Sequence, residues 1–176
     1  MKRQQIIVLD GADMCGKTQI ARELSHRINV PYYKASDEHQ AFVGKQDYFI
    51  NSLKYSDTRL VDFIRQTETS VIFDRCWPSE YVYSLFFDRP TDLETLWEID
   101  RRYAQLGAKI VLCTRSTFAG IHDDLKPDWI GPEELHRLDM LYHLFAADSK
   151  CEIHWLNVDD ENLDREVTEI QKFLDL

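Results

Sequence analysis

The fold is decided by the stretch Ile6-Ile7-Val8-Leu9-Asp10-Gly11-Ala12-Asp13-Met14-Cys15-Gly16-Lys17-Thr18. Its apolar first part predicts a strand that is buried on both faces. Residues 11–18 match the pattern G-x-x-x-x-G-K-[ST], and residues 17–28 have the apolar spacing of a helix. A strand, a glycine-containing loop and a helix in this order predict a loop whose backbone N–H groups surround a phosphate.

The residue types of this loop indicate a nucleotide as the ligand. Lys17 would place its charge on the β- and γ-phosphates, and Thr18 would offer its hydroxyl to Mg²⁺. Gly11 and Gly16 allow the backbone to approach the phosphates closely. We therefore expect ATP and Mg²⁺ as cofactors. The predicted ATP-binding residues are Gly11, Ala12, Asp13, Met14, Cys15, Gly16, Lys17, Thr18 and Arg115.

Outward from the loop, strand-like and helix-like segments alternate along the chain. Short apolar runs predict further strands at residues 30–33, 70–73, 109–113 and 152–158. Helices are predicted at residues 39–66 with a break near 56–57, and at 78–87, 91–106, 132–147 and 163–174, with Thr91 as the N-cap of the 91–106 helix. This alternation predicts an α/β fold with a five-stranded parallel sheet and helices on both faces. Ligands of such sheets bind at the carboxyl ends of the strands.

Length and charge restrict the class of protein. The 176 residues fit a single domain that spans residues 1–176. The formal net charge of −10 disfavours a nucleic-acid partner, because an acidic chain repels a phosphate backbone. No apolar run approaches the ~20 residues that a membrane span needs, and no signal-peptide pattern follows Met1. We therefore expect no membrane association and a cytoplasmic location.

The four cysteines are Cys15, Cys76, Cys113 and Cys151, and none of them forms a C-x-x-C pair. This spacing favours reduced thiols over a zinc site or a redox dithiol. Cys15 lies at the N-terminus of a predicted helix, an environment that lowers the pKa of a thiol, so we expect it to be open to electrophiles. We expect no catalytic role for it, because phosphoryl transfer depends on positioning and charge.

Two stretches of the chain resemble the thymidylate kinase family, to which the deoxynucleoside kinases are near relatives. The first is residues 8–18, set against the family pattern apolar-apolar-Glu-Gly-x-Asp-Gly-x-Gly-Lys-[Ser/Thr]. Here Asp10 replaces the Glu, Asp13 matches, and Met14 replaces a Gly. The second stretch matches the family pattern Asp-Arg-[Tyr/His]-x-x-Ser-x-x-x-Tyr and reads Asp74-Arg75-Cys76-Trp77-Pro78-Ser79-Glu80-Tyr81-Val82-Tyr83. In addition, Arg137 and Tyr142 resemble an Arg and a Tyr in the helix that follows the family's lid.

The resemblance implies roles for residues beyond the loop. Asp74 would hold Mg²⁺ or orient the acceptor, and Arg75 would bridge the donor and acceptor phosphates. The implied catalytic residues are thus Lys17, Asp74 and Arg75, and the implied metal ligands are Thr18 and Asp74. The implied substrate-binding residues are Asp37, Arg59, Arg75 and Ser79.

The chain departs from the family pattern at the acceptor side. Where the family's second strand ends in a Thr-Arg-Glu-Pro-like sequence, this chain has Lys34-Ala35-Ser36-Asp37-Glu38. Lys34, Asp37 or Glu38 would contact the acceptor there, and an ordinary polar loop with an N-cap is an equal alternative. The candidate lid, residues 116–131, contains only Lys126 as a cation, with Arg115 just before it and Arg137 just after.

The resemblance implies an ATP-dependent kinase with a small-molecule acceptor. A nucleoside 5′-monophosphate is the leading acceptor, with dTMP or a related deoxypyrimidine nucleotide as the first candidate, and such a kinase could act as a homodimer. The alternative is a deoxynucleoside kinase, in which Asp37 or Glu38 would supply a carboxylate near the acceptor 5′-OH. A kinase acting on DNA ends or modified bases is disfavoured by the net charge. A guanine-nucleotide switch is disfavoured because the chain has no Asn-Lys-x-Asp sequence.

Overall fold

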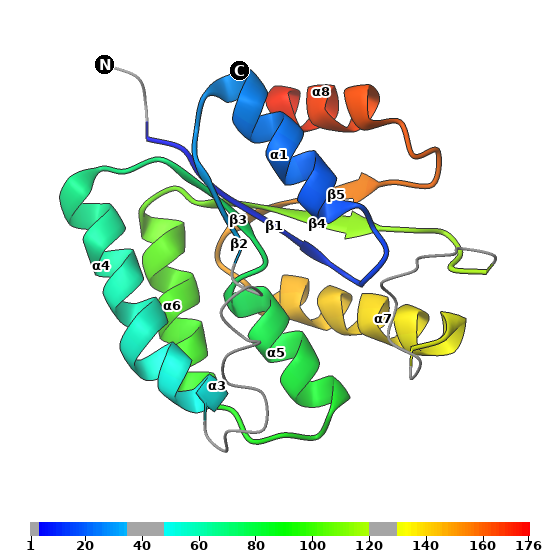
Figure 1. The fold of residues 1–176 in the computed structure, drawn as a ribbon. Coiled ribbons are helices and arrows are strands. Elements are labelled where there is room, and N and C mark those ends of the chain that lie inside the picture. Colours follow the sequence, from blue (N-terminus) through cyan, green and yellow to red (C-terminus); the bar gives the residue numbers. More distant parts are fainter. Residues whose placement is uncertain (1–3, 35–47, 120–129) are drawn as a thin grey trace.

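A five-stranded sheet runs through the centre of the molecule (Figure 1). The computed structural model of the protein describes residues 4–34, 48–119 and 130–176. The strands are parallel and lie in the order β2-β3-β1-β4-β5. Their bounds are β1 (Ile6–Gly11), β2 (Tyr32–Lys34), β3 (Val71–Asp74), β4 (Lys109–Thr114) and β5 (Glu152–Asn157). The predicted five-stranded parallel sheet is therefore confirmed.

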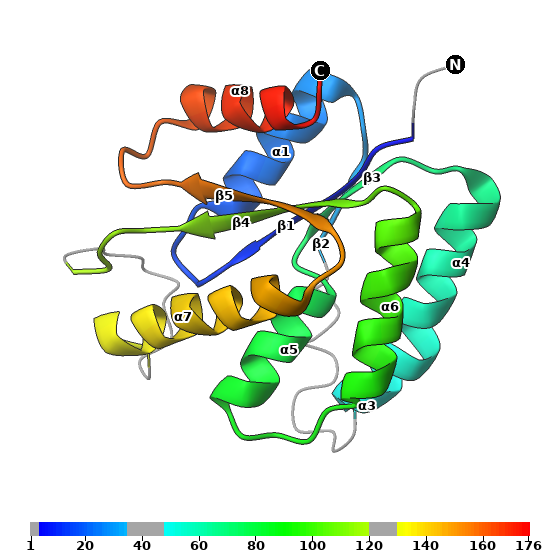
Figure 2. The same cartoon turned by 180° about the vertical axis from the view of Figure 1, so that it is seen from behind.

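Helices cover both faces of this sheet, as Figures 1 and 2 show from opposite sides. One face carries α1 (Lys17–Ile28) and α8 (Leu163–Phe173), which pack against each other. The other face carries α4 (Thr58–Thr67), α5 (Trp77–Phe86), α6 (Leu93–Gln105) and α7 (Pro132–Asp148). The short helix α3 (Tyr48–Asn51) and the π-helical segment η2 (Ser52–Asp57) lead into α4.

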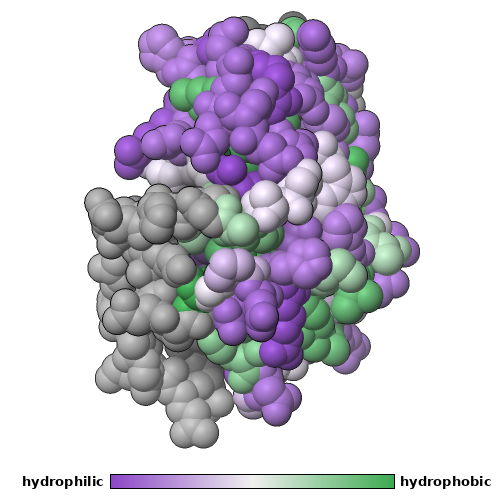
Figure 3. All heavy atoms as spheres, turned by 90° about the vertical axis from the view of Figure 1, so that its right-hand side faces the viewer, coloured by the Kyte–Doolittle hydropathy of each residue, from purple (hydrophilic) through white to green (hydrophobic). Residues whose placement is uncertain are grey.

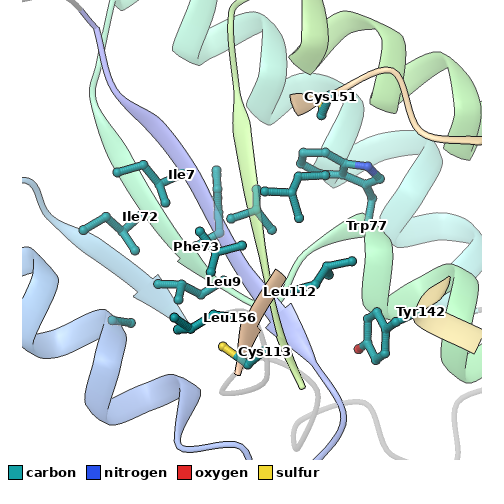
Figure 4. Close-up of a cluster of buried hydrophobic side chains, with 14 of the residues drawn as sticks. Ile7, Leu9, Ile72, Phe73, Trp77, Leu112, Cys113, Tyr142, Cys151 and Leu156 are labelled. Atoms are coloured by element: carbon teal, nitrogen blue, oxygen red, sulfur yellow. The ribbon is translucent and has the colours of Figure 1, made fainter. Parts of the chain in front are cut away.

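The burial of the strands explains this layered arrangement. Every residue of β1 is buried, and β4 is buried from Ile110 to Cys113. Strands that are apolar on both faces are stable only when helices cover both sides of the sheet. Figure 4 shows part of the resulting core, with side chains of β1, β3 and β4 and with Trp77 and Tyr142 from the helical layer.

Two predicted details of the helices were wrong. The helix expected to be capped by Thr91 has Asp92 as its N-cap, and the Asp92 side chain accepts a 3.0 Å hydrogen bond from the Thr95 N–H. The Thr91 hydroxyl instead donates to Glu80 of α5 at 3.0 Å. The break expected near residues 56–57 is a π-helical turn that continues into α4. In both places a tertiary contact or a wider helical turn replaced the simpler local pattern.

The sheet topology brings the ends of three strands to one edge. Strand β1 lies between β3 and β4, with Leu9 opposite Asp74 and Gly11 opposite Cys113. Gly11 has a φ of 131°, and an added Cβ would lie 2.2 Å from the carbonyl oxygen of Cys113. Only glycine therefore fits at the point where β1 passes into the loop. This edge is the place where ligands bind in parallel sheets.

Figure 3 shows the side of the molecule toward which β1, β4 and β5 point. Hydrophilic residues dominate the described part of this face. Such a surface suits charged ligands better than a large apolar partner. Of the helices within the described ranges, none is both long and apolar enough to cross a lipid bilayer.

Candidate active site

The loop between β1 and α1 requires unusual backbone angles. Met14 and Gly16 both adopt the left-handed conformation, with φ values of 65° and 64°. Position 14 is the one at which the thymidylate kinase pattern has a glycine, and the left-handed φ explains that preference. Met14 adopts the same conformation at a cost of about 1–3 kcal/mol, which the surrounding fold must offset.

Lys17 is held inside this loop. The residue is 6% exposed, and its ammonium group donates a hydrogen bond to the carbonyl oxygen of Ala12. Lys17 is also the first residue of α1, so its charge and the positive end of the helix dipole lie on the same short segment. Both features favour the binding of a phosphate at this point.

Thr18 and Asp74 meet although 56 positions separate them in the chain. The Thr18 hydroxyl donates a 2.6 Å hydrogen bond to Oδ2 of Asp74. Asp74 is the last residue of β3 and is 2% exposed. A hydroxyl and a carboxylate are hard oxygen ligands, the kind that Mg²⁺ prefers beside phosphate oxygens and water. The structure thus brings together the two predicted metal ligands, and the pair fits that ion.

Arg75 follows Asp74 in a turn that β1 holds in place. Its φ is 68°, and its backbone N–H donates to the carbonyl oxygen of Leu9 at 2.9 Å. The next N–H, that of Cys76, donates to Oδ2 of Asp10 at 3.3 Å. The left-handed conformation is unfavourable for an arginine, and these two contacts from β1 stabilise it.

The guanidinium of Arg75 reaches back to the loop. It forms an ion pair with Asp13, and its Nη1 donates to the Ser79 hydroxyl at 3.1 Å. Its central carbon lies 5.2 Å from the centre of the Tyr83 ring. The side chain is only 16% exposed. A charge in such a poorly hydrated place acts more strongly on a neighbouring phosphate than a surface charge does.

Asp13 is the anion that this arginine meets. Its Oδ2 also accepts a 2.6 Å hydrogen bond from the Tyr83 hydroxyl. Burial raises the pKa of Asp13, but the charges of Arg75 and Lys17 outweigh that effect, and the pKa lies below its usual value. Asp13 is therefore ionised at neutral pH and links the loop to the residues that follow β3.

Asp10 is a centre of hydrogen bonding that the sequence did not place in the site. It is fully buried and accepts hydrogen bonds from the Ser79 hydroxyl at 2.7 Å, the Ser79 N–H at 3.1 Å and the Tyr142 hydroxyl at 2.7 Å. The sequence carried one signal, an acidic residue directly before the loop. Its partners come from α5 and α7, so only the fold reveals the network.

Arg115 lies beside the loop, as expected for an ATP-binding residue. Its Nε donates to the carbonyl oxygen of Met14 at 3.1 Å, and its Nη2 lies 2.9 Å from Glu161. The neighbouring Ser116 N–H donates to Asp159 at 2.9 Å. The end of β4 is thereby tied both to the loop and to the segment between β5 and α8. The role of Arg115 toward ATP stays a prediction.

One other predicted residue, Arg59, is not assembled with this group, and several more cannot be compared with it. Arg59 is exposed on α4, which lies on the side of the molecule away from the loop (Figure 1). Asp37 and Glu38 lie outside the described residues, and so do residues 120–129 of the candidate lid. The substrate-binding roles of Asp37 and Arg59 stay predictions. Ser79 and Arg75, in contrast, lie within hydrogen-bonding distance of each other.

The expected reactivity of Cys15 is contradicted by the structure. The residue is fully buried. Burial raises the pKa of its thiol above the ordinary value, although the charges of Lys17 and Arg115 act in the opposite direction. The helix N-terminus lowers a thiol pKa only where the thiol faces its N–H groups or water, whereas this side chain belongs to the hydrophobic core.

Comparisons with known proteins agree with this architecture. No protein-family model and no curated protein matches the sequence. Solved structures do match over nearly the whole chain. The YorR protein of Bacillus subtilis, solved in complex with phosphorylated GDP, has a TM-score of 0.68 and 22% identity, with 98% of this chain and 96% of that chain covered. The chain shares its fold with this nucleotide-bound protein.

Two further matches support that assignment of the fold. The thymidylate kinase of Ehrlichia chaffeensis has a TM-score of 0.58 and 16% identity, with 98% of this chain and 100% of that chain covered. The deoxyadenosine kinase of M. mycoides, solved with the products dCMP and dCDP, has a TM-score of 0.55 and 17% identity over 97% and 99% of the two chains. The predicted likeness to thymidylate and deoxynucleoside kinases is thus confirmed at the level of the fold.

Proposed function

We propose that the protein is a kinase that transfers the γ-phosphate of ATP to a nucleoside 5′-monophosphate, with dTMP or a related deoxypyrimidine nucleotide as the first candidate. Such an enzyme would serve nucleotide biosynthesis in the cytoplasm. The observation that carries the proposal is the 2.6 Å contact between Thr18 and Asp74, with Arg75 next in the chain. This hydrogen bond joins the predicted phosphate-binding loop to the end of β3, where a carboxylate and a guanidinium follow each other in the chain.

The donor side of the proposed reaction rests on the loop. Lys17 would contact the β- and γ-phosphates, and the first turn of α1 would add its N–H groups. Thr18 and Asp74 would hold Mg²⁺ together with phosphate oxygens and water. Bound magnesium would neutralise part of the phosphate charge. The chain's own contribution is therefore to position the triphosphate and to surround it with fixed positive groups.

The acceptor side rests on Arg75. Its planar guanidinium suits contacts with two phosphate oxygens, and it keeps its charge at every accessible pH. Its ion pair with Asp13 places it against the loop, which is the position needed to reach both a donor and an acceptor phosphate. This placement favours an acceptor that already carries a phosphate. The YorR protein, which has the same fold, was solved with phosphorylated GDP bound.

The experiment that tests the proposal is a survey of acceptors. The protein is incubated with γ-labelled ATP and Mg²⁺ and, in parallel, with nucleosides, their 5′-monophosphates and DNA, and the labelled products are identified. The proposal predicts labelled nucleoside diphosphates, and the Lys17→Ala variant serves as the inactive control. Labelled nucleoside monophosphates would instead identify a deoxynucleoside kinase, in line with the likeness to the M. mycoides enzyme. Label in DNA alone would contradict both assignments.

A further inference from the structure

Asp10 caps helix α5 from another element of the fold. The N-cap residue of α5 is Cys76, whose side chain makes no capping hydrogen bond. Oδ2 of Asp10 instead accepts from the N–H groups of Cys76 at 3.3 Å and of Ser79 at 3.1 Å. The first turn of a helix leaves its N–H groups short of partners, and the Ser79 N–H is shared between Asp10 and the carbonyl oxygen of Cys76, which lies 3.1 Å away. The buried carboxylate thus fixes the start of α5 directly after Arg75.

Two hydroxyl groups lie between this carboxylate and the guanidinium of Arg75. Nη1 of Arg75 is 3.7 Å from Oδ1 of Asp10, too far for a direct hydrogen bond. The Ser79 and Tyr142 hydroxyls each donate to Oδ1 of Asp10 at 2.7 Å. The same two hydroxyl oxygens accept from Nη1 at 3.1 and 3.4 Å. Each hydroxyl thus contacts both the carboxylate and the guanidinium, and the two hydroxyl oxygens lie 3.2 Å from each other.

Tyr142 differs from the other members of this network in its origin. Asp10 belongs to β1, Arg75 to the β3–α5 turn and Ser79 to the first turn of α5, whereas Tyr142 belongs to α7. Its side chain is fully buried and appears among the labelled core residues of Figure 4. Burial and the charge of Asp10 raise the pKa of Tyr142 well above its usual value, so the phenol remains a hydrogen-bond donor. The phenol donates to Asp10, and in its contact with Arg75 the guanidinium donates to the phenol oxygen, because a guanidinium has no acceptor.

We propose that Tyr142 is a positioning residue for phosphoryl transfer, which from helix α7 holds the Arg75 guanidinium in its working orientation together with Asp10 and Ser79. This inference rests on the proposed function. An arginine side chain has several rotatable bonds, and a displacement of about 1 Å at a reacting centre lowers a rate by about a hundredfold. Ser79 and Asp13 hold the guanidinium from α5 and the loop, and Tyr142 adds a restraint from a third element.

The test compares two substitutions of buried tyrosines by phenylalanine. Tyr142→Phe removes the hydroxyl between Asp10 and Arg75 and leaves the ring in the core. Tyr103→Phe is the matched control, because Tyr103 is fully buried and its hydroxyl has no hydrogen-bond partner in the described part of the protein. We expect kcat to fall about tenfold for Tyr142→Phe, with an unchanged KM for ATP, and to stay within about twofold for the control.

The Arg75→Ala background separates positioning from a general loss of packing. If Tyr142 acts through Arg75, Tyr142→Phe should change kcat by less than about twofold once Arg75 is alanine. Thermal unfolding of each variant verifies that it folds, and Ser79→Ala, which removes the parallel hydroxyl, is tested in the same cycle. For Ser79→Ala we expect the same result, a change in kcat of less than about twofold once Arg75 is alanine.

The outcomes are distinct. A full tenfold loss that persists in the Arg75→Ala background would overturn the inference, as would equal kinetics for Tyr142→Phe and Tyr103→Phe. A wild-type protein that labels no acceptor would remove the proposed function, and the positioning role with it. A wild-type protein that labels nucleotides while Tyr142→Phe is unaffected would remove the positioning role alone.

Discussion

The hydroxyl of Thr18 lies 2.6 Å from Oδ2 of Asp74 and joins the first turn of α1 to the end of β3. The parallel register of β1 and β3, with Leu9 opposite Asp74, makes this contact possible. The hydrogen bond satisfies a carboxylate that is 2% exposed. In the proposed reaction, the same hydroxyl and carboxylate would hold magnesium.

The metal dependence of activity should change when Asp74 loses its charge. We expect Asp74→Asn to lower kcat and to shift the Mg²⁺ titration to higher concentrations, because an amide oxygen is a weaker ligand than a carboxylate. Activity is measured as a function of Mg²⁺ at saturating ATP. Asp88→Asn, on the exposed turn after α5, is the control and should leave the titration unchanged. An unaltered titration for Asp74→Asn would assign that residue to acceptor orientation or to structure.

Lys17 should be required for transfer but not for folding. Its ammonium group contacts the loop carbonyl of Ala12, and we expect Lys17→Ala to lower the rate by roughly a hundredfold or more. Circular dichroism and thermal unfolding should show a folded variant. Lys150→Ala, an exposed lysine before β5, should keep full activity. A Lys17→Ala protein with more than about a tenth of the wild-type rate would contradict the assignment of the loop.

Arg75→Ala should distinguish the two kinds of acceptor. A monophosphate carries charge in the ground state, so loss of the guanidinium should raise the acceptor KM and lower kcat together. A nucleoside has no such charge, and the loss would then act mainly on kcat. Steady-state kinetics with a nucleoside and its 5′-monophosphate give the comparison, with the exposed Arg101→Ala on α6 as control. Equal or better use of the nucleoside would refute a monophosphate acceptor.

Low pH should reduce the free energy of unfolding, and protonation of Asp13 should account for part of that reduction. Burial opposes its ionisation, but Arg75 and Lys17 hold the folded-state pKa below the unfolded value of 3.8. A depressed pKa contributes stability that is fully present above the unfolded pKa and is lost as pH falls through the folded pKa. Wild type should therefore exceed Asp13→Asn in free energy of unfolding at pH 7, and the difference should shrink below pH 4. Denaturant titrations at several pH values measure it, and a pH-independent difference would contradict the expectation.

The sequence by itself determined the parts of the protein whose chemistry is local. The loop pattern places Lys17 and Thr18 at the start of a helix, and the alternation of strands and helices leads to the parallel sheet. The pair Asp74 and Arg75 at a strand end also follows from adjacent residues. The resemblance to the thymidylate kinases implied Thr18 and Asp74 as joint metal ligands, and the order of the strands in the sheet brings the two residues together.

Only the tertiary structure decided which side chains surround Arg75. The hydroxyls of Ser79 and Tyr142 both contact Asp10 because α5 and α7 pack against each other and against β1 on one face of the sheet. The spacing of these residues in the sequence does not predict that contact. Burial likewise decided that Cys15 is a core residue with a raised thiol pKa, against the expectation drawn from its place at a helix start. Local patterns follow from neighbouring residues, whereas burial and long-range hydrogen bonds follow from how whole elements pack.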